Sequence, residues 1–315
     1  MTNKPFKPGD IEGIVKNAKR KSIKRNIIIT TLLIIILGFI AIIGNGVIVS
    51  WAFNKASEGN ELLYEISEPN VVIGQAKLSS GILSGEYIYQ KYKLIEDKVV
   101  PWGTEQKAFN ALGKNTPSAK YDSVSSGETK QGIRYYNPTN GQRMMLFYHP
   151  WLEYKTIQND LSLIEKAPSD AVMEVAISFD RPFSVNEIQK FLNLRKKITW
   201  YWVNDYYKND KKNLQGLHET GDSASLVYGF NATAAGGDGD TLGQNEDDYI
   251  AILTKLKGLG SYDYIVDRLL ETEKENRNDG LILGVVVTGT KDELLKLKED
   301  KHIRAISLGA VATDF

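Results

Sequence analysis

The chain has 315 residues, of which 42% are hydrophobic and 25% charged, proportions typical of a folded protein with one or two domains. Basic and acidic residues number 39 each, but residues 1–26 hold eight basic and two acidic ones, so the remainder is mildly acidic, which argues against nucleic acid as a ligand. The chain has no cysteine, which excludes disulfides, thiolate nucleophiles and cysteine metal sites.

The first predicted element is a transmembrane helix at residues 27–49, after a short basic segment at 1–26. This stretch holds 23 residues without a charge, and as a helix it would span roughly 34 Å, enough to cross a bilayer core. It is also longer than the apolar part of a cleaved secretory signal. We therefore expect an uncleaved, single-pass anchor.

The basic residues predict the direction of this anchor. They crowd the segment before the span, whereas only Lys55 follows closely after it, and such residues favour the cytoplasmic side. We expect a cytoplasmic N-terminus, with the chain from Trp51 onward outside. Trp51 and Phe53 fall where an aromatic belt would lie. Asn45, a polar residue in the span, could reach the outer headgroups or bind a partner helix.

After the span we expect a polar, acidic linker at residues 50–69 and a strand-rich region at 70–165. Residues 87–95 are rich in aromatic and β-branched types and predict a strand. Residues 104–112 and 158–166 resemble short helices. Within residues 132–150, two apolar runs flank Asn140-Gly141, which predicts a β-hairpin.

Residues 166–315 predict two strand–helix–strand units. In the first, residues 173–179 alternate in polarity as a strand that ends at Asp180, and Ser184 with Glu187 fits a helix capping box before a strand at 198–206. The second has a strand at 281–288, a capping box at Thr290 and Glu293, and a strand at 303–312. The fold class is thus α+β, with a ferredoxin-like pair of βαβ units or, alternatively, two unrelated ones. An insertion at about 208–280 would carry helices at 246–257 and 262–276.

Candidate chemistry is sparse. Glu174 and Asp180 lie six residues apart on one strand, roughly 20 Å, too far to flank one scissile bond. We expect Glu174 to be either exposed or paired with a basic residue. The acidic loop at 236–248 lacks the oxygen ligands of a calcium-binding loop, and the three histidines have no metal-ligand spacing. We predict no catalytic, cofactor or metal site, and hence no enzyme. An envelope hydrolase is disfavoured because no catalytic set can be named.

Trp200 and Trp202 share one face of a predicted strand. Such side chains usually pack in a core, although exposed ones stack on sugars or peptides. The alternative function is therefore a cell-surface peptide- or glycan-binding module without a signalling role.

Several segments resemble the sigma factor regulator family of bacterial membrane proteins. They are KRKSIKRNIIITTLLII (19–35), YYNPTNGQRMMLFYHP (135–150), APSDAVMEVAISFDRPFSVNEIQKFL (167–192) and ITWYWVNDYY (198–207). The resemblance extends from about residue 14 to 315 and implies N- and C-terminal sigma factor regulator domains. It also implies anti-sigma-like control of an extracytoplasmic-function sigma factor.

The chain departs from this pattern in its cytoplasmic segment, since about 26 residues are too few to fold alone, and a zinc-bearing anti-sigma module would need cysteine. We therefore expect an outer domain that senses envelope conditions, or pairs with another membrane subunit that holds the sigma factor. The expected partners are the lipid bilayer and a sigma factor or such a subunit, but not nucleic acid.

Overall fold

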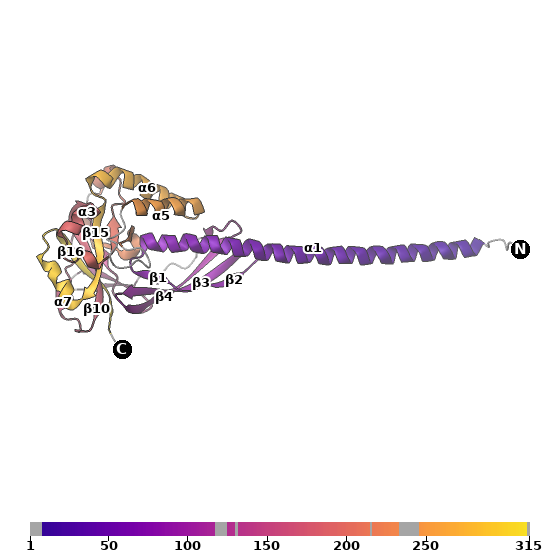
Figure 1. Ribbon diagram of the computed structural model, residues 1–315, viewed down its shortest axis with the longest axis horizontal. Coiled ribbons are helices and arrows are strands. Elements are labelled where there is room, and N and C mark those ends of the chain that lie inside the picture. The colour runs from indigo at the N-terminus through magenta and orange to yellow at the C-terminus, as the bar shows by residue number, and fades with distance from the viewer. Residues whose placement is uncertain (1–7, 117–124, 130–131, 215, 233–245, 314–315) are drawn as a thin grey trace.

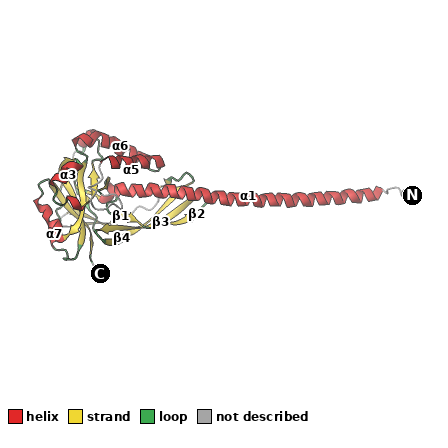
Figure 2. Ribbon diagram, viewed as in Figure 1, coloured by secondary structure: helices red, strands yellow, loops and turns green. Residues whose placement is uncertain are grey.

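The computed structural model describes residues 8–116, 125–129, 132–214, 216–232 and 246–313. A long N-terminal helix projects from a body built of strands and shorter helices (Figure 1). Both kinds of element are well represented in that body (Figure 2), which confirms the mixed α and β content expected from the sequence.

Helix α1, Pro8–Ser67, has 60 residues and is therefore roughly 90 Å long. It contains the predicted span and is long and apolar enough there to cross a membrane. Its side chains from residue 12 to 43 are exposed. The helix stops before Pro69, which lacks an amide hydrogen and disfavours helical geometry in the preceding residue.

The prediction of a linker at residues 50–69 is wrong, because α1 continues through this segment. Val49, Ala52, Ala56 and Tyr64 are buried and follow the three- and four-residue spacing of one helix face. The acidic composition of the segment hid this narrow apolar stripe. The second half of α1 is consequently part of the folded body.

The first sheet lies beside the second half of α1 and has the order β1-β3-β4-β5, with β2 also paired to β3 (Figure 1). Strands β3 and β4 form a long antiparallel hairpin whose turn includes Glu96 at positive φ. Tyr87 and Phe109 from these strands pack on Phe53 of α1. The strands are β1 Val71–Ile73, β2 Lys77–Ser80, β3 Ser84–Ile95, β4 Lys98–Asn110 and β5 Asn115–Thr116.

The short helix predicted at residues 104–112 is wrong, since most of this segment belongs to β4. The segment has a helix-favouring composition, but cross-strand pairing with β3 decides its conformation, as tertiary context often does for strands. The strand predicted at residues 87–95 is confirmed as part of β3.

The segment predicted as a hairpin at residues 132–150 forms only a local turn. The turn is closed by an isolated antiparallel bridge between Tyr136 and Arg143, and Asn137 accepts and donates hydrogen bonds within it. The two apolar runs then pair elsewhere, β7 with β6 and β8 with β13. These short elements are β6 Ser125–Thr129, β7 Gly132–Tyr136, β8 Leu146–Phe147, β9 Glu153–Tyr154 and α2 Leu161–Glu165.

The second sheet has the order β14-β11-β15-β10-β16, and every neighbouring pair is antiparallel. Strands β10 and β11 flank β15 and are therefore parallel to each other, joined through helix α3. Strands β15 and β16 flank β10 in the same way and are joined through α7. The elements are β10 Val172–Phe183, α3 Val185–Phe191, η1 Arg195–Lys197, β11 Ile198–Val203, β14 Gly229–Asn231, β15 Ile282–Thr290, α7 Lys291–Leu294, η4 Leu295–Glu299 and β16 Ile303–Ala312.

Both predicted capping boxes are present. Ser184 and Glu187 satisfy each other's backbone amides at the start of α3, as Thr290 and Glu293 do at the start of α7. The strand break expected at Asp180 is wrong, because β10 continues through Pro182 to Phe183 with a register shift against β15. That irregularity accommodates Pro182, which has no amide hydrogen to donate to the ladder.

The insertion between β11 and β15 holds both predicted helices, and α5 lies alongside α1 (Figure 1). An ion pair between Lys255 of α5 and Glu58 of α1, at 2.7 Å, joins them. The elements of this insertion are α4 Lys208–Asn213, β12 Leu217–His218, β13 Asp222–Ser223, η2 Ala224–Leu226, α5 Glu246–Leu259, α6 Asp263–Asn276 and η3 Arg277–Asp279.

Candidate functional site

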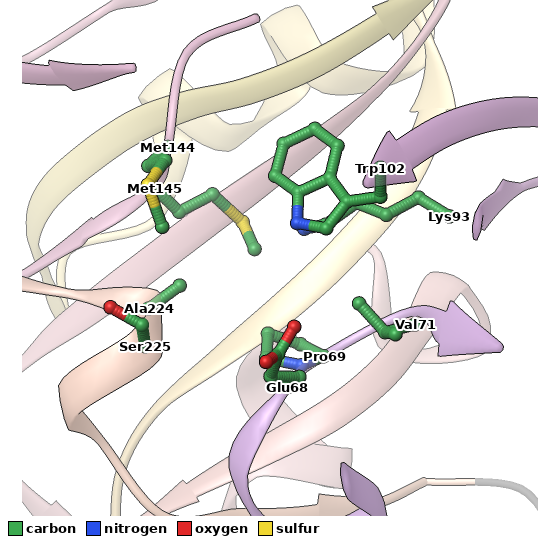
Figure 3. A pocket seen from close by; sticks show the side chains of 9 residues that line it. All are labelled: Glu68, Pro69, Val71, Lys93, Trp102, Met144, Met145, Ala224 and Ser225. Atoms are coloured by element: carbon green, nitrogen blue, oxygen red, sulfur yellow. The ribbon is translucent and has the colours of Figure 1, made fainter. Parts of the chain in front are cut away.

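The candidate site is the junction where α1 ends and the two sheets meet. Two adjoining cavities, of about 110 Å³ and 20 Å³, lie there and share four lining residues, Glu68, Trp102, Met144 and Ser225. Figure 3 shows the carboxylate of Glu68 pointing into the space between the methionines and Trp102. Residues far apart in the sequence therefore converge where the long helix enters the body.

Lys91 of β3 is the centre of the first charged cluster. Its side chain is 4% exposed, and its Nζ lies 3.2 Å from Glu68 Oε1 and 3.3 Å from Glu105 Oε2. The Tyr64 hydroxyl donates to Glu105, and the Tyr64 ring lies 5.3 Å from Lys91 Nζ. One lysine thus ties the end of α1 to both strands of the β3–β4 hairpin.

The two carboxylates around Lys91 titrate differently. Burial raises the pKa of Glu68 above its ordinary 4.5, and the nearby Lys91 offsets this only in part. Burial also raises the pKa of Glu105, but Lys91 and Lys107 outweigh it and the net pKa is lowered from 4.5. On acidification Glu68 therefore takes up a proton before Glu105 does.

The raised pKa of Glu68 and the lowered pKa of Glu105 predict that replacing each residue changes the pH dependence of stability in a different pH range. The pKa of Glu68 is higher in the folded chain than in the unfolded chain. The folded chain therefore loses stability as the pH rises above about 4.5 and Glu68 ionises. The lowered pKa of Glu105 means that its stabilisation is present above 4.5 and lost as the pH falls below it. This is the linkage between proton binding and unfolding.

We therefore expect Glu68→Gln to flatten the loss of stability between pH 4.5 and neutral pH, and Glu105→Gln to flatten the loss below pH 4.5. The measurement is the thermal unfolding midpoint of the full chain in detergent micelles across both ranges. If Glu68→Gln kept the wild-type slope above pH 4.5, the assignment of Glu68 would be wrong.

The second charged cluster is formed by Lys93 of β3 and Glu174 of β10. Their side chains are 3% and 0% exposed, and Lys93 Nζ lies 2.6 Å from Glu174 Oε1. Glu174 also accepts from Asn70 Nδ2 at 3.0 Å and from the Ala310 amide at 3.1 Å. The sequence left two environments open for Glu174, and the structure selects pairing with a basic residue.

Two neighbours fit this buried pair closely. Lys93 Nζ lies 4.4 Å from the centre of the Trp102 ring, a cation–π arrangement. A Cβ atom at Gly309 of β16 would lie 2.6 Å from Glu174 Oε1, so only glycine leaves room there for the carboxylate. Asn70, just after α1, has a φ of 63°, a conformation that asparagine adopts more readily than most residues.

Asp180, the other carboxylate singled out from the sequence, does not line either cavity of this junction. Asp180 is half-exposed and lies 3.6 Å from His302 Nδ1, and Glu174 is engaged with Lys93, so the structure does not bring the two carboxylates together. The acidic loop at 236–248 lies largely outside the described residues. Among the described residues, no group of three or more His, Asp or Glu side chains could hold a metal ion.

Trp200 and Trp202 are fully buried. They pack with Phe147, Met145 and other apolar side chains on one face of the second sheet. Neither ring is available to stack on a sugar or a peptide, so the observation that motivated a surface binding module is overturned. Asn45, by contrast, has partners within the chain, the backbone of Gly81 and Leu83.

Sequence reasoning missed Lys91 and Lys93. Their signal is the two-residue period of β3, in which Tyr87, Tyr89, Lys91, Lys93 and Ile95 share the buried face. A lysine on the buried face of a strand requires a partner. Only the folded structure shows that the partners come from α1, β4 and β10.

Comparisons with known families match most of the chain. A model described as sigma factor regulator N-terminal matches residues 12–100, and one described as sigma factor regulator C-terminal matches residues 164–310. Comparisons with curated proteins and with solved structures found no match. Lys93 lies in the first matched region and Glu174 in the second, so their ion pair joins the two.

Proposed function

Because this chain belongs to the sigma factor regulator family, we propose that it is a membrane-anchored, anti-sigma-like regulator of an extracytoplasmic-function sigma factor. Its basic N-terminal segment lies in the cytoplasm, α1 crosses the bilayer once, and the body of strands and short helices lies outside as a sensory or interaction domain. The positive-inside distribution of lysine and arginine supports this orientation.

The observation that carries the proposal is the continuity of α1. One helix runs without interruption from the basic segment, through the apolar span, to Tyr64 and Ser67 at the buried junction. There Lys91 ties it to the first sheet. Asn70, two residues beyond Glu68, hydrogen-bonds to Glu174 in the second sheet. A displacement between the two sheets therefore acts directly on the membrane helix.

We also assign the second sheet to a ferredoxin-like arrangement. The assignment is supported by the order β11-β15-β10-β16 and by the two strand–helix–strand units that share this sheet. Glu174, the buried carboxylate of its inner strand β10, is paired and hydrogen-bonded on both oxygens. We assign it a structural role, which fits a regulatory rather than an enzymatic protein.

The test compares transcription in cells that carry or lack the chain. We expect its deletion to change transcription from promoters of the cognate sigma factor under envelope stress, and re-expression of the full chain to restore it. Affinity purification of the membrane-embedded protein should recover the sigma factor or a second membrane subunit that binds it.

A chain that ends after residue 69 is the matched control, since it keeps the cytoplasmic segment and the span. We expect it to remain in the membrane but to lose the response to envelope stress. Unchanged transcription on deletion, together with recovery of neither partner, would contradict the proposal and favour a module without a signalling role.

A further inference from the structure

The tip of the β2–β3 hairpin lies beside the apolar part of α1. Asn45 Nδ2 donates to the Gly81 carbonyl at 3.0 Å, and the Leu83 amide donates to Asn45 Oδ1 at 2.8 Å. Asn45 is four residues before the end of the predicted span at Val49, which places the tip roughly 6 Å inside that end. The hairpin therefore reaches back along the helix to the depth of the span (Figure 1).

The residues at the tip are unusually apolar for a turn that is exposed to water. The Gly81 amide donates to the Ser84 carbonyl at 2.8 Å, so Ile82 and Leu83 are the central residues of the turn. Such positions usually carry Gly, Asn, Asp or Ser. Leu83 even has a φ of 53°, which is uncommon for a residue other than glycine or asparagine.

These apolar side chains are uncovered within the described part of the chain. Ile82 is 87% exposed and Leu83 47%. On α1, within six residues of Asn45, Val47 and Trp51 are 65% and 53% exposed. The tip and the helix thus both present apolar side chains near the end of the span, and the two hydrogen bonds to Asn45 satisfy backbone groups that lipid would leave without partners.

We propose that Ile82 and Leu83 insert into the outer leaflet of the bilayer, so that the outer domain sits on the membrane at the hairpin tip as well as through α1. This rests on the proposed membrane anchoring of α1. Asn45, a polar residue within the span, is the group that holds the tip at this depth.

The absence of native cysteine permits single-site labelling of the full chain. The variants are Ile82→Cys at the tip, Leu37→Cys in the middle of the span and Tyr264→Cys on α6, where the side chain is 85% exposed. Each carries an environment-sensitive nitrobenzoxadiazole label in vesicles of phosphatidylethanolamine and phosphatidylglycerol. One set of vesicles contains lipids with a nitroxide near the headgroup end of the acyl chain, and another contains nitroxides near its methyl end.

We expect the label at Ile82 to have blue-shifted emission, to be quenched most by the shallow nitroxide and to be protected from aqueous iodide. The label at Leu37 should be quenched most by the deep nitroxide, and the label at Tyr264 only by iodide. Asn45→Ala in the Ile82→Cys background should lower the shallow quenching several-fold, because the tip loses both hydrogen bonds.

Three results would count against parts of this picture. Iodide quenching at Ile82 equal to that at Tyr264, with normal quenching at Leu37, would overturn the insertion of the tip while leaving the anchor intact. Blue-shifted emission at Ile82 without lipid quenching would mean that protein covers the tip, and would overturn it too. No lipid quenching at Leu37 would instead contradict the membrane span, and with it both proposals.

Discussion

Replacing Glu174 with alanine in the full chain is expected to lower the free energy of unfolding by about 3–5 kcal/mol, because the buried Lys93 ammonium then loses its counter-ion. Lys93 is only 3% exposed on its side chain, so little of its charge is hydrated in the folded protein. The measurement is urea or thermal unfolding of the protein in detergent micelles.

Two further variants test the origin of this loss. Lys93→Met with Glu174→Leu removes both charges and should recover much of the stability, because a buried pair replaced by apolar groups is often close to neutral. Lys155→Ala breaks an exposed ion pair with Glu219 and should change stability by less than about 1 kcal/mol. Equal losses in Glu174→Ala and Lys155→Ala would show that the buried pair has no special role.

Trp202→Ala is expected to cost about 3–5 kcal/mol, as large-to-small substitutions of buried aromatic residues do. The ring is fully buried, with its centre 5.0 Å from that of Phe147 and 4.7 Å from that of His149. Its removal leaves a cavity between β11 and the segment that precedes β9. Loss of the near-ultraviolet circular dichroism signal at a lower temperature or urea concentration reports this effect.

The controls separate a core role from a binding role. Trp202→Phe keeps most of the volume and removes a buried indole N–H that has no hydrogen-bond partner among the described residues, so it should cost much less than Trp202→Ala. Tyr264→Ala, at an exposed aromatic residue, should leave the midpoint unchanged. A Trp202→Ala protein with the wild-type midpoint would contradict the packing described above and return this residue to the set of candidate binding groups.

Local patterns predicted much of this fold. The capping boxes at Ser184 and Thr290 depend on residues three apart, and the strands around them on a two-residue period, so both were accessible from the sequence. The apolar span was accessible for the same reason. These features need no information about distant parts of the chain.

The failures all involve distant partners. Most of residues 104–112 became a strand because β3 was available to pair with them. Residues 50–67 became a helix with one buried side because the first sheet and α5 cover that side. The junction depends on such contacts even more strongly, since Lys93 and Glu174 are 81 positions apart. From the sequence one can infer that each buried lysine needs a partner, but not which residue that partner is.

The contacts at Asn45 and at Tyr64 have a mechanical consequence. Between them α1 covers 19 residues, roughly 28 Å, and between Leu83 and Lys91 the β3 side covers eight residues, roughly 26 Å. The two lengths are similar, and Phe53 of α1 packs on Tyr87 of β3 between the two contacts. Helix and strand are thus joined at both ends and in the middle, an arrangement that resists bending. If α1 crosses the membrane as proposed, motion of the body would reach the span as tilt or rotation of the whole helix.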